Sequence, residues 1–262
     1  MDSLSAQVPG DHDMIWRYMD FTNFVFLLAR KQLHFTRLDE FNDPFEGCWP
    51  KENARWFVEW VRATCRVGKP EELQRKLRML DPQFASLMLR HTVFVNCWHL
   101  NDGESDAMWK LYAQGNKGVA VISRFGRLKA IMDRPCKEII QFAKVVYIDH
   151  DKGFIDPSNP VSPCLCKHKS FEHERELRAY IWRAGEMIDM NMIGKVDMPK
   201  GLDVDVDLNE LIEEIVIGPT VPEWTFKLTK KVLSDYGCAK PIKQSLLNCQ
   251  PSWIAKNLDE AV

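Results

Sequence analysis

Residues 171–180 hold the densest group of side chains in this sequence that could do chemistry. In the run Phe-Glu-His-Glu-Arg-Glu-Leu-Arg-Ala-Tyr, strand-like alternation would place Glu172, Glu174, Glu176 and Arg178 on one side. Carboxylates on one face repel each other unless a cation or a hydroxyl-bearing ligand joins them, and Arg178 can neutralise one of them. The pattern therefore indicates either an ion-pair lattice or a catalytic edge, with Glu174 and Glu176 as the candidate acids.

An arginine between two aromatic residues is the second candidate. On a short strand the side chain of Arg17 points away from Trp16 and Tyr18, so it faces a cleft or solvent if the two rings face the core. A guanidinium in a cleft suits a phosphate or a carboxylate, which it binds through paired donors. The alternative is a surface arginine on an edge strand.

A stiff acidic turn follows at residues 41–47, with the sequence Phe-Asn-Asp-Pro-Phe-Glu-Gly. Asn and Asp side chains bond the backbone in such turns, and Pro fixes one dihedral angle. The turn offers Asn42 for a polar contact, and we expect Asp43 and Glu46 to shape the loop rather than to act on a substrate.

Two aromatic residues, Trp109 and Tyr112, are three positions apart and would share one face of a helix. The pair could stack a planar ring, although packing in the core is the simpler role. The Cys164-x-Cys166-x-His168 grouping is too closely spaced for a zinc knuckle, so no metal site is predicted. Walker, Gly-x-Gly-x-x-Gly and Gly-x-Ser-x-Gly motifs are absent from the sequence.

Short elements must position these residues. The pattern of many short strands, with helices mostly in the first half, predicts an α+β fold in one domain. We expect a loose N-terminus over 1–13, one domain over 14–249 and a polar tail over 250–262, with a helical insertion at 51–90 that shapes a target groove. In chain order, the other expected elements are strands at 15–19, 33–37, 92–98, 118–123, 141–149, 176–182 and 214–217, and helices ending at Arg30 and over 105–114, 125–132 and 222–236.

Composition limits the classes of function. The net charge of −2 gives no overall attraction to nucleic acid or acidic membranes, although a basic groove could exist locally. No apolar run is long enough to span a membrane, and residues 1–13 do not read as a signal peptide. The eight cysteines have no framework spacing, which is typical of reduced thiols in a cytoplasmic protein.

The order of these motifs resembles an uncharacterised bacterial family, a domain of unknown function found in abortive-infection (phage-defence) proteins of the AbiGi type. The resemblance covers about residues 14–220, and one departure is Trp98-His99, where Phe-Ser would be expected. The matching segments are Trp16–Tyr18, Leu33–Thr36, Phe41–Glu46, Val95–Trp98, Met108–Ala113, Gly118–Val121 and Glu174–Arg178.

More distantly, the layout is similar to the ADP-ribosyltransferase superfamily, and within it to DarT-like toxins that modify DNA. That resemblance implies a central split sheet, antiparallel or mixed, and NAD as a substrate. It also implies Arg17 with Tyr18 and Asn42 in NAD binding, Trp109 or Tyr112 stacking on nicotinamide, and Glu176 or Glu174 as the catalytic carboxylate. The acceptor would be a macromolecule, either nucleic acid or protein.

Two other classes of function stay open from the sequence. The chain could be a non-catalytic effector module that binds nucleic acid or protein, which would tolerate Glu176→Gln. It could also be a metal-dependent nuclease that uses Asp43, Glu46 and the acidic run 172–176, which would fail in chelator.

Overall fold

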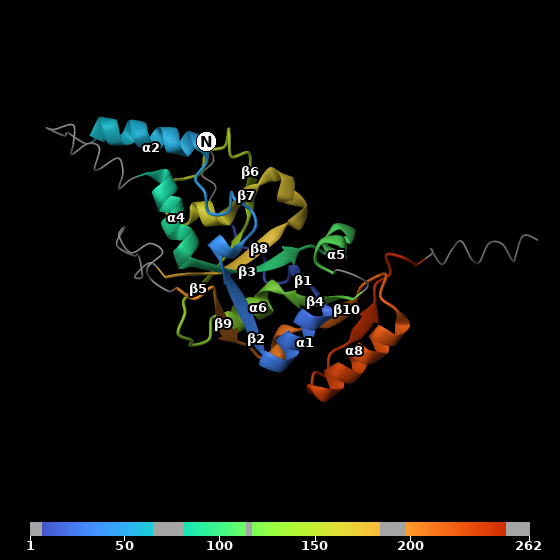
Figure 1. Cartoon of the computed structure of the whole chain (residues 1–262). Coiled ribbons are helices and arrows are strands. Elements are labelled where there is room, and N and C mark those ends of the chain that lie inside the picture. Colours follow the sequence, from blue (N-terminus) through green and yellow to red (C-terminus); the bar gives the residue numbers. More distant parts are fainter. Residues whose placement is uncertain (1–6, 65–80, 114–116, 184–197, 250–262) are drawn as a thin grey trace, which may run out of the picture. The chain divides into compact units, whose positions relative to one another are not determined.

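The computed structural model describes residues 7–64, 81–113, 117–183 and 198–249 (Figure 1). The chain forms two compact units, and the described residues of the first fall within Met1–Asp11, Gln32–Leu100 and Met132–Val206. Those of the second fall within His12–Lys31, Asn101–Ile131 and Asp207–Val262. Each unit combines helices with strands that pair mostly antiparallel, so the predicted α+β class is confirmed.

The second unit contains four strands in the order β11-β10-β4-β1, in which only the β10–β11 pair is parallel. Side chains that pack together on one face of its sheet are Trp16, Tyr18, Met108, Trp109, Ala120, Ile122 and Val216. Its elements are β1 (Met14–Asp20), α1 (Phe21–Arg30), α5 (Asp106–Tyr112), β4 (Gly118–Arg124), α6 (Phe125–Met132), α7 (Leu208–Leu211), β10 (Glu214–Ile217), α8 (Glu223–Asp235) and β11 (Ile242–Gln244).

The first unit contains five antiparallel strands in the order β5-β8-β3-β2-β9 and a separate parallel pair, β6-β7. Strand β8 lies between β3 and β5, so its residues are enclosed along both edges. The elements are β2 (Gln32–Arg37), η1 (Leu38–Glu40), α2 (Lys51–Thr64), α4 (Pro82–Thr92), β3 (Val93–Leu100), β5 (Ile140–Lys144), β6 (Val146–Ile148), η2 (Ser162–Leu165), β7 (Cys166–His168), η3 (Lys169–Glu174), β8 (Glu176–Trp182) and β9 (Gly201–Asp205).

Local sequence signals explain where the helices begin and end. The Asp20 carboxylate accepts a hydrogen bond from the Asn23 backbone N at 2.8 Å and caps α1, and Lys31 ends the helix in the left-handed conformation. Helix α4 begins with Pro82 after the capping residue Asp81, whose carboxylate accepts from Gln83 N. The expected helices in these two places are therefore confirmed.

The structure corrects one expected strand and adds several others. The strand expected over 141–149 is two strands, because β5 pairs antiparallel with β8 whereas β6 pairs parallel with β7. Strands β7, β9 and β11 were not expected, and each has three to five residues. Residues 65–80 of the expected helical insertion lie outside the described residues, as does the tail over 250–262.

Two features of the described chain bear on its surroundings. None of the helices in the described ranges is long and apolar enough to cross a bilayer. The seven cysteines in the same ranges are all free thiols.

Candidate functional site

The predicted site residues fall into two groups, one in each unit. Asn42, Glu174 and Glu176 belong to the first unit. The second unit holds four of the five residues expected to contact a cofactor, namely Arg17, Tyr18, Trp109 and Tyr112.

A buried ion cluster surrounds Glu176 in the first unit. The Arg178 guanidinium donates from Nε to Glu176 Oε1 at 2.8 Å and from Nη2 to Glu46 Oε1 at 2.8 Å. The Lys167 ammonium lies 2.5 Å from Glu174 Oε2, 3.5 Å from Glu176 Oε2 and 3.6 Å from Glu46 Oε1. All five side chains are at least nine-tenths buried. The ion-pair lattice is thus present in the structure, and it contains both candidate acids.

The charges in this cluster control the protonation of Glu176. Burial alone would raise the pKa of its carboxyl group, but Arg178 and Lys167 outweigh that effect and lower the pKa from 4.5 to about 2. Burial would likewise lower the pKa of Lys167, and the carboxylates of Glu176 and Glu174 raise it above its ordinary value. Glu176 is therefore ionised and Lys167 is protonated at neutral pH.

A sharp turn brings Glu174 and Glu176 to the same cluster. The expectation that the acidic run would alternate along one strand is wrong for Glu172 and Glu174, because both lie in the 3₁₀ helix η3. Arg175 then adopts a left-handed conformation with φ of 40°, and β8 begins at Glu176. In a regular strand, residues two apart lie on the same face. Here the turn at Arg175, and not a strand, brings Glu174 and Glu176 together.

Two side chains from other elements hold the backbone on either side of this turn. The Glu176 backbone N donates to the Tyr147 hydroxyl at 2.7 Å, and the His99 ring shares a hydrogen bond of 2.6 Å with the Glu174 carbonyl. His99 lies in β3 opposite Glu176 and is buried. Burial lowers the pKa of His99, so its ring is neutral and can donate to that carbonyl.

The acidic turn at 41–47 has two different carboxylates. Asp43 shapes the loop as expected, since its carboxylate accepts from the Phe45 backbone N at 2.9 Å. Glu46 is completely buried and pairs with Arg178, which corrects the expectation that it only shapes the loop. Asn42 is exposed on the same turn.

Lys167 is the cluster member that sequence reasoning missed. It lies between Cys166 and His168 in the Cys-x-Cys-x-His grouping, which was considered only as a possible metal site. Burial raises the pKa of the Cys166 thiol to about 12, so Cys166 is protonated at neutral pH. Among the residues that the structure describes, no group of three or more His, Cys, Asp or Glu side chains could hold a metal ion. Lys167 follows the apolar residues Cys164–Cys166 and is followed by His168 and Lys169, so no local signal marks it as buried.

In the second unit, Tyr18 and Trp109 are in contact. Their ring centroids are 4.8 Å apart and their planes are perpendicular, and the Trp16 ring stacks on Tyr18 at 5.9 Å. The Tyr18 hydroxyl accepts from the Ser105 backbone N, which is the N-cap of α5. Trp16 and Tyr18 thus share one face of β1, as the alternation predicts, and Arg17 lies half-buried on the other face with the buried Ile15 and Met19.

Trp109 and Tyr112 differ in their exposure. The Trp109 side chain is 4% exposed and donates from Nε1 to Glu104 Oε2 at 3.0 Å. Tyr112 is 43% exposed at the end of α5. Of the two rings, Tyr112 is the one whose position suits contact with a ligand, whereas Trp109 packs in the core.

Replacing Gly118 is expected to disturb the packing around Trp109. A Cβ atom at Gly118 would lie 2.3 Å from the Ala113 Cβ and 3.1 Å from ring carbons of Trp109. We expect Gly118→Ala to lower the free energy of unfolding by about 1–3 kcal/mol, because overpacking forces neighbours to shift. Gly103→Ala is the matched control, since its Cβ would meet nothing within 4 Å. Urea unfolding of both variants checks this, and equal stability of the two would contradict the packing described here.

The low pKa of Glu176 predicts acid sensitivity. A carboxyl group whose pKa falls from 4.5 in the unfolded chain to about 2 in the folded one stabilises the fold above pH 4.5. That contribution, about 3 kcal/mol, is expected to disappear as the pH falls from 4.5 toward 2. Urea unfolding across this range measures the slope, which should be shallower in Glu176→Gln. An identical slope in the variant would mean that Glu176 is not the titrating group.

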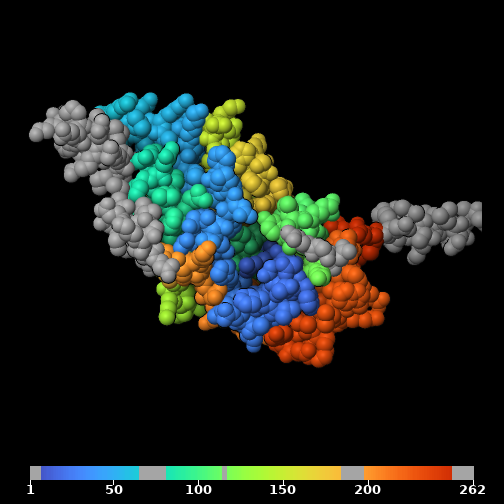
Figure 2. All heavy atoms as spheres, viewed as in Figure 1, coloured from blue at the N-terminus to red at the C-terminus, as the bar shows by residue number. Residues whose placement is uncertain are grey.

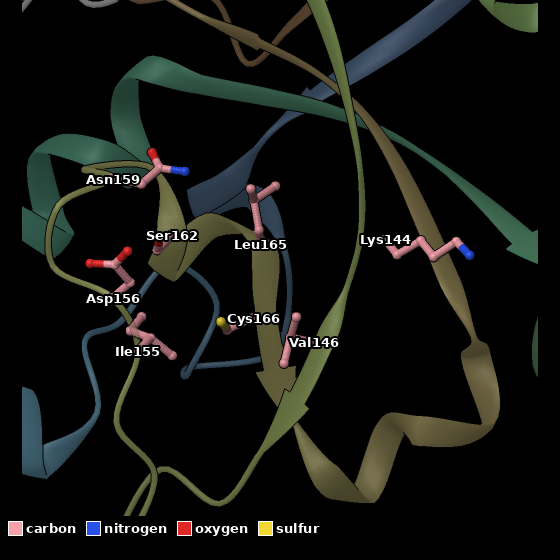
Figure 3. A pocket seen from close by; sticks show the side chains of 8 residues that line it. All are labelled: Lys144, Val146, Ile155, Asp156, Asn159, Ser162, Leu165 and Cys166. Atoms are coloured by element: carbon pink, nitrogen blue, oxygen red, sulfur yellow. The ribbon is translucent and has the colours of Figure 1, made fainter. Parts of the chain in front are cut away.

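A small cavity lies in the first unit, between β6, β7 and the loop that follows β6. Figure 3 shows eight side chains that line it, among them Val146, Ile155 and Cys166. Its volume is about 20 Å³, which is room for a water molecule and not for a substrate.

Comparisons with known proteins add three findings. Residues 108–179 match a family model described as a protein of unknown function (DUF2971). No curated protein matches the chain. Among solved structures, the chain is similar to DarT from Thermus sp. 2.9 in complex with ADP-ribosylated ssDNA. Identity is 10%, the TM-score is 0.39, and the match covers 92% of this chain and 98% of that one. The family match includes Trp109, Tyr112, Glu174 and Glu176, and it excludes Arg17 and Asn42.

Proposed function

We propose that the chain is an ADP-ribosyltransferase-like enzyme that uses NAD either to modify a macromolecule or to consume NAD itself. The observation that carries this proposal is the ion cluster around Glu176. Its three carboxylates, Glu46, Glu174 and Glu176, face two cations, Lys167 and Arg178, which leaves a formal charge of −1. A buried site with excess negative charge suits a reaction whose transition state is positive.

The proposed reaction develops that positive charge on the ribose. The bond between the ribose C1′ and the nicotinamide nitrogen breaks, and its electron pair leaves with nicotinamide. A nucleophile of the acceptor, or water, then attacks C1′ and gives up a proton. An ionised carboxylate fixed near the ribose stabilises the oxocarbenium-like state more than the ground state, and such stabilisation raises the rate.

The cluster supplies two properties that this role requires. Arg178 and Lys167 keep Glu176 ionised despite its burial. The Glu176 carboxylate is also fixed in orientation, because Arg178 bonds both of its oxygens, at 2.8 Å and 3.2 Å. Preorganised charge of this kind needs no rearrangement during the reaction.

We assign the remaining candidates to NAD binding. Arg17 would bind the pyrophosphate, and Asn42 would make a polar contact from its rigid turn. Tyr112 would stack on the nicotinamide, with Tyr18 and Trp109 fixing helix α5 from the core. The acceptor would be a nucleic acid or a protein, and the resemblance to abortive-infection proteins suggests a role in phage defence or as a toxin.

Nicotinamide release tests this function directly. The purified chain is incubated with NAD, with and without an extract that supplies acceptors, and free nicotinamide is measured by chromatography. We expect release in at least one condition, unchanged by chelator, and NAD binding by calorimetry. Absence of NAD binding at millimolar concentration would refute the proposal, and activity on nucleic acid that chelator abolishes would favour the nuclease alternative.

A further inference from the structure

A second candidate site lies in the first unit, in a cleft of about 520 Å³. Four segments line it: the turn at 44–49, helix α2, helix α4, and residues His150 and Asp151. Both helices lie at the surface of this unit (Figure 2). The cleft has the size of a small-molecule site, and its lining is largely apolar with a few polar groups, as such sites usually are.

An aromatic wall stands at one side of the cleft. The Phe45 ring is 47% exposed, and its centroid lies 5.1 Å from that of the His150 ring. His150 in turn stacks on His168 at 6.0 Å, with 17° between the planes. Pro44 restricts the turn that carries Phe45, and the Asp43 carboxylate bonds the Phe45 backbone N. The exposed ring is thus held in place before any ligand arrives.

Arg90 brings a positive charge to the same cleft. Its Nη1 donates a long hydrogen bond to the Pro44 carbonyl at 3.5 Å, its guanidinium also interacts with the Cys48 thiol, and its buried Nε has no hydrogen-bond partner among the described residues. Within the described ranges, no carboxylate lies within 4.0 Å of Arg90. Lys51, exposed at the start of α2, adds a second cation and is 4.0 Å from Asp151.

Further polar atoms that line the cleft have no hydrogen-bond partner among the described residues. They are the Trp49 Nε1 and both ring nitrogens of His150, and the His150 side chain is more than nine-tenths buried. Burial lowers the pKa of His150, so the ring is neutral, with one donor and one acceptor. Buried polar atoms are normally paired, so unpaired ones in a cleft indicate a missing partner. Most of the unpaired groups of these cleft residues are donors, which suits a ligand with acceptor oxygens.

We infer that this cleft binds a small planar ring that carries an oxyanion, either a phosphate or a carboxylate. The ring packs against Phe45, and the oxyanion meets Arg90 and Lys51. The inference does not depend on the proposed NAD chemistry, because none of the residues lining the cleft is assigned to that reaction. A nucleotide and an aromatic acid share this chemistry and are separated by experiment.

Isothermal titration with four probes tests the inference. AMP represents the ring with a phosphate, indole-3-acetate represents the ring with a carboxylate, and adenosine and inorganic phosphate each lack one half. We expect AMP or indole-3-acetate to bind, and adenosine and phosphate to bind at least about tenfold more weakly.

Variants assign the binding to this cleft. Arg90→Met keeps the apolar stem that packs on Gly47 and removes the charge, and it should weaken binding by about tenfold or more. Phe45→Leu removes the exposed ring and should weaken binding several-fold. Arg55→Met is the matched control, because Arg55 is exposed on α2 and pairs with Glu52 outside the cleft. Its affinity should be that of the unmodified chain.

Three outcomes would overturn the inference. The first is no binding of AMP or indole-3-acetate at millimolar concentration, and the second is equal affinity in Arg90→Met and Arg55→Met. The third is loss of AMP binding in Arg17→Gln with no change in Arg90→Met, which would place the nucleotide in the proposed NAD site. Nicotinamide release by Arg90→Met, measured in parallel, separates failure of this inference from failure of the proposed enzyme activity.

Discussion

Replacing Arg178 with Met is expected to lower the free energy of unfolding by about 3–5 kcal/mol, which is the cost of removing one partner of a buried ion pair. The Arg178 side chain is completely buried and bonds Glu46, Glu176 and the Cys164 carbonyl, the last at 2.5 Å. Met fills much of the same volume but leaves both carboxylates without this partner. Guanidinium unfolding followed by tryptophan fluorescence and circular dichroism measures the loss.

Two further variants show whether charge is the cause. Arg55→Met removes an exposed arginine that pairs with Glu52 at 2.6 Å, and we expect a change within about 0.5 kcal/mol. The double variant Arg178→Met, Glu176→Met is expected to be more stable than Arg178→Met alone, because it removes one of the stranded carboxylates. If Arg178→Met cost less than about 1 kcal/mol, water would have to reach the cluster, and its members would not be buried as described.

Local signals in the sequence predicted most of the elements. The aromatic alternation at 16–18 placed two rings on one face of β1, and Asp20 capped α1. These features depend on residues within about four positions of each other in the sequence. Hydrophobic periodicity and capping residues are patterns of that range, so they predict such features. The same holds for Asp43, whose side chain bonds the backbone two residues later.

The ion cluster could not be predicted from such local signals in the sequence. Glu46 and Arg178 are 132 residues apart in sequence, and no local pattern connects them. Lys167 lies on β7, a strand of three residues that exists because it pairs with β6. The turn at Arg175 is also the reason why strand alternation did not hold for residues 172–176. A left-handed arginine is uncommon and cannot be anticipated from the residue type. Tertiary pairing therefore decided which of the sequence's carboxylates are buried together.

The turn at 41–47 connects the two candidate sites of the first unit. Its Glu46 carboxylate points into the ion cluster and bonds Arg178, while the ring of the preceding residue, Phe45, lines the cleft. These two neighbouring residues thus belong to different sites, and the Asp43 side chain holds the backbone at Phe45. A ligand on the Phe45 ring would therefore contact the residue next to Glu46. The rigidity that the sequence predicted for this turn therefore helps to position one residue of the ion cluster, Glu46, and one residue of the cleft, Phe45.

Glu176→Gln is expected to reduce nicotinamide release by about 100-fold or more, the size of effect seen when one preorganised electrostatic contact to a transition state is removed. Gln keeps the shape of the side chain, and it loses the charge that would face the ribose. The loss should appear in kcat, with NAD affinity changed little, because the interaction is made in the transition state. Initial rates over a range of NAD concentrations measure both quantities.

Glu46→Gln is the matched control for this variant, because Glu46 is equally buried and bonds the same Arg178 Nη2. Both substitutions remove one carboxylate from Arg178 and should cost similar stability, so melting temperatures identify any loss through misfolding. We expect Glu46→Gln to keep release within about tenfold of the unmodified chain, since this carboxylate does not open β8. Glu174→Gln decides between the two candidate acids, because the one whose loss abolishes kcat is catalytic. Equal losses in Glu46→Gln and Glu176→Gln would instead assign the whole cluster to stabilising the fold.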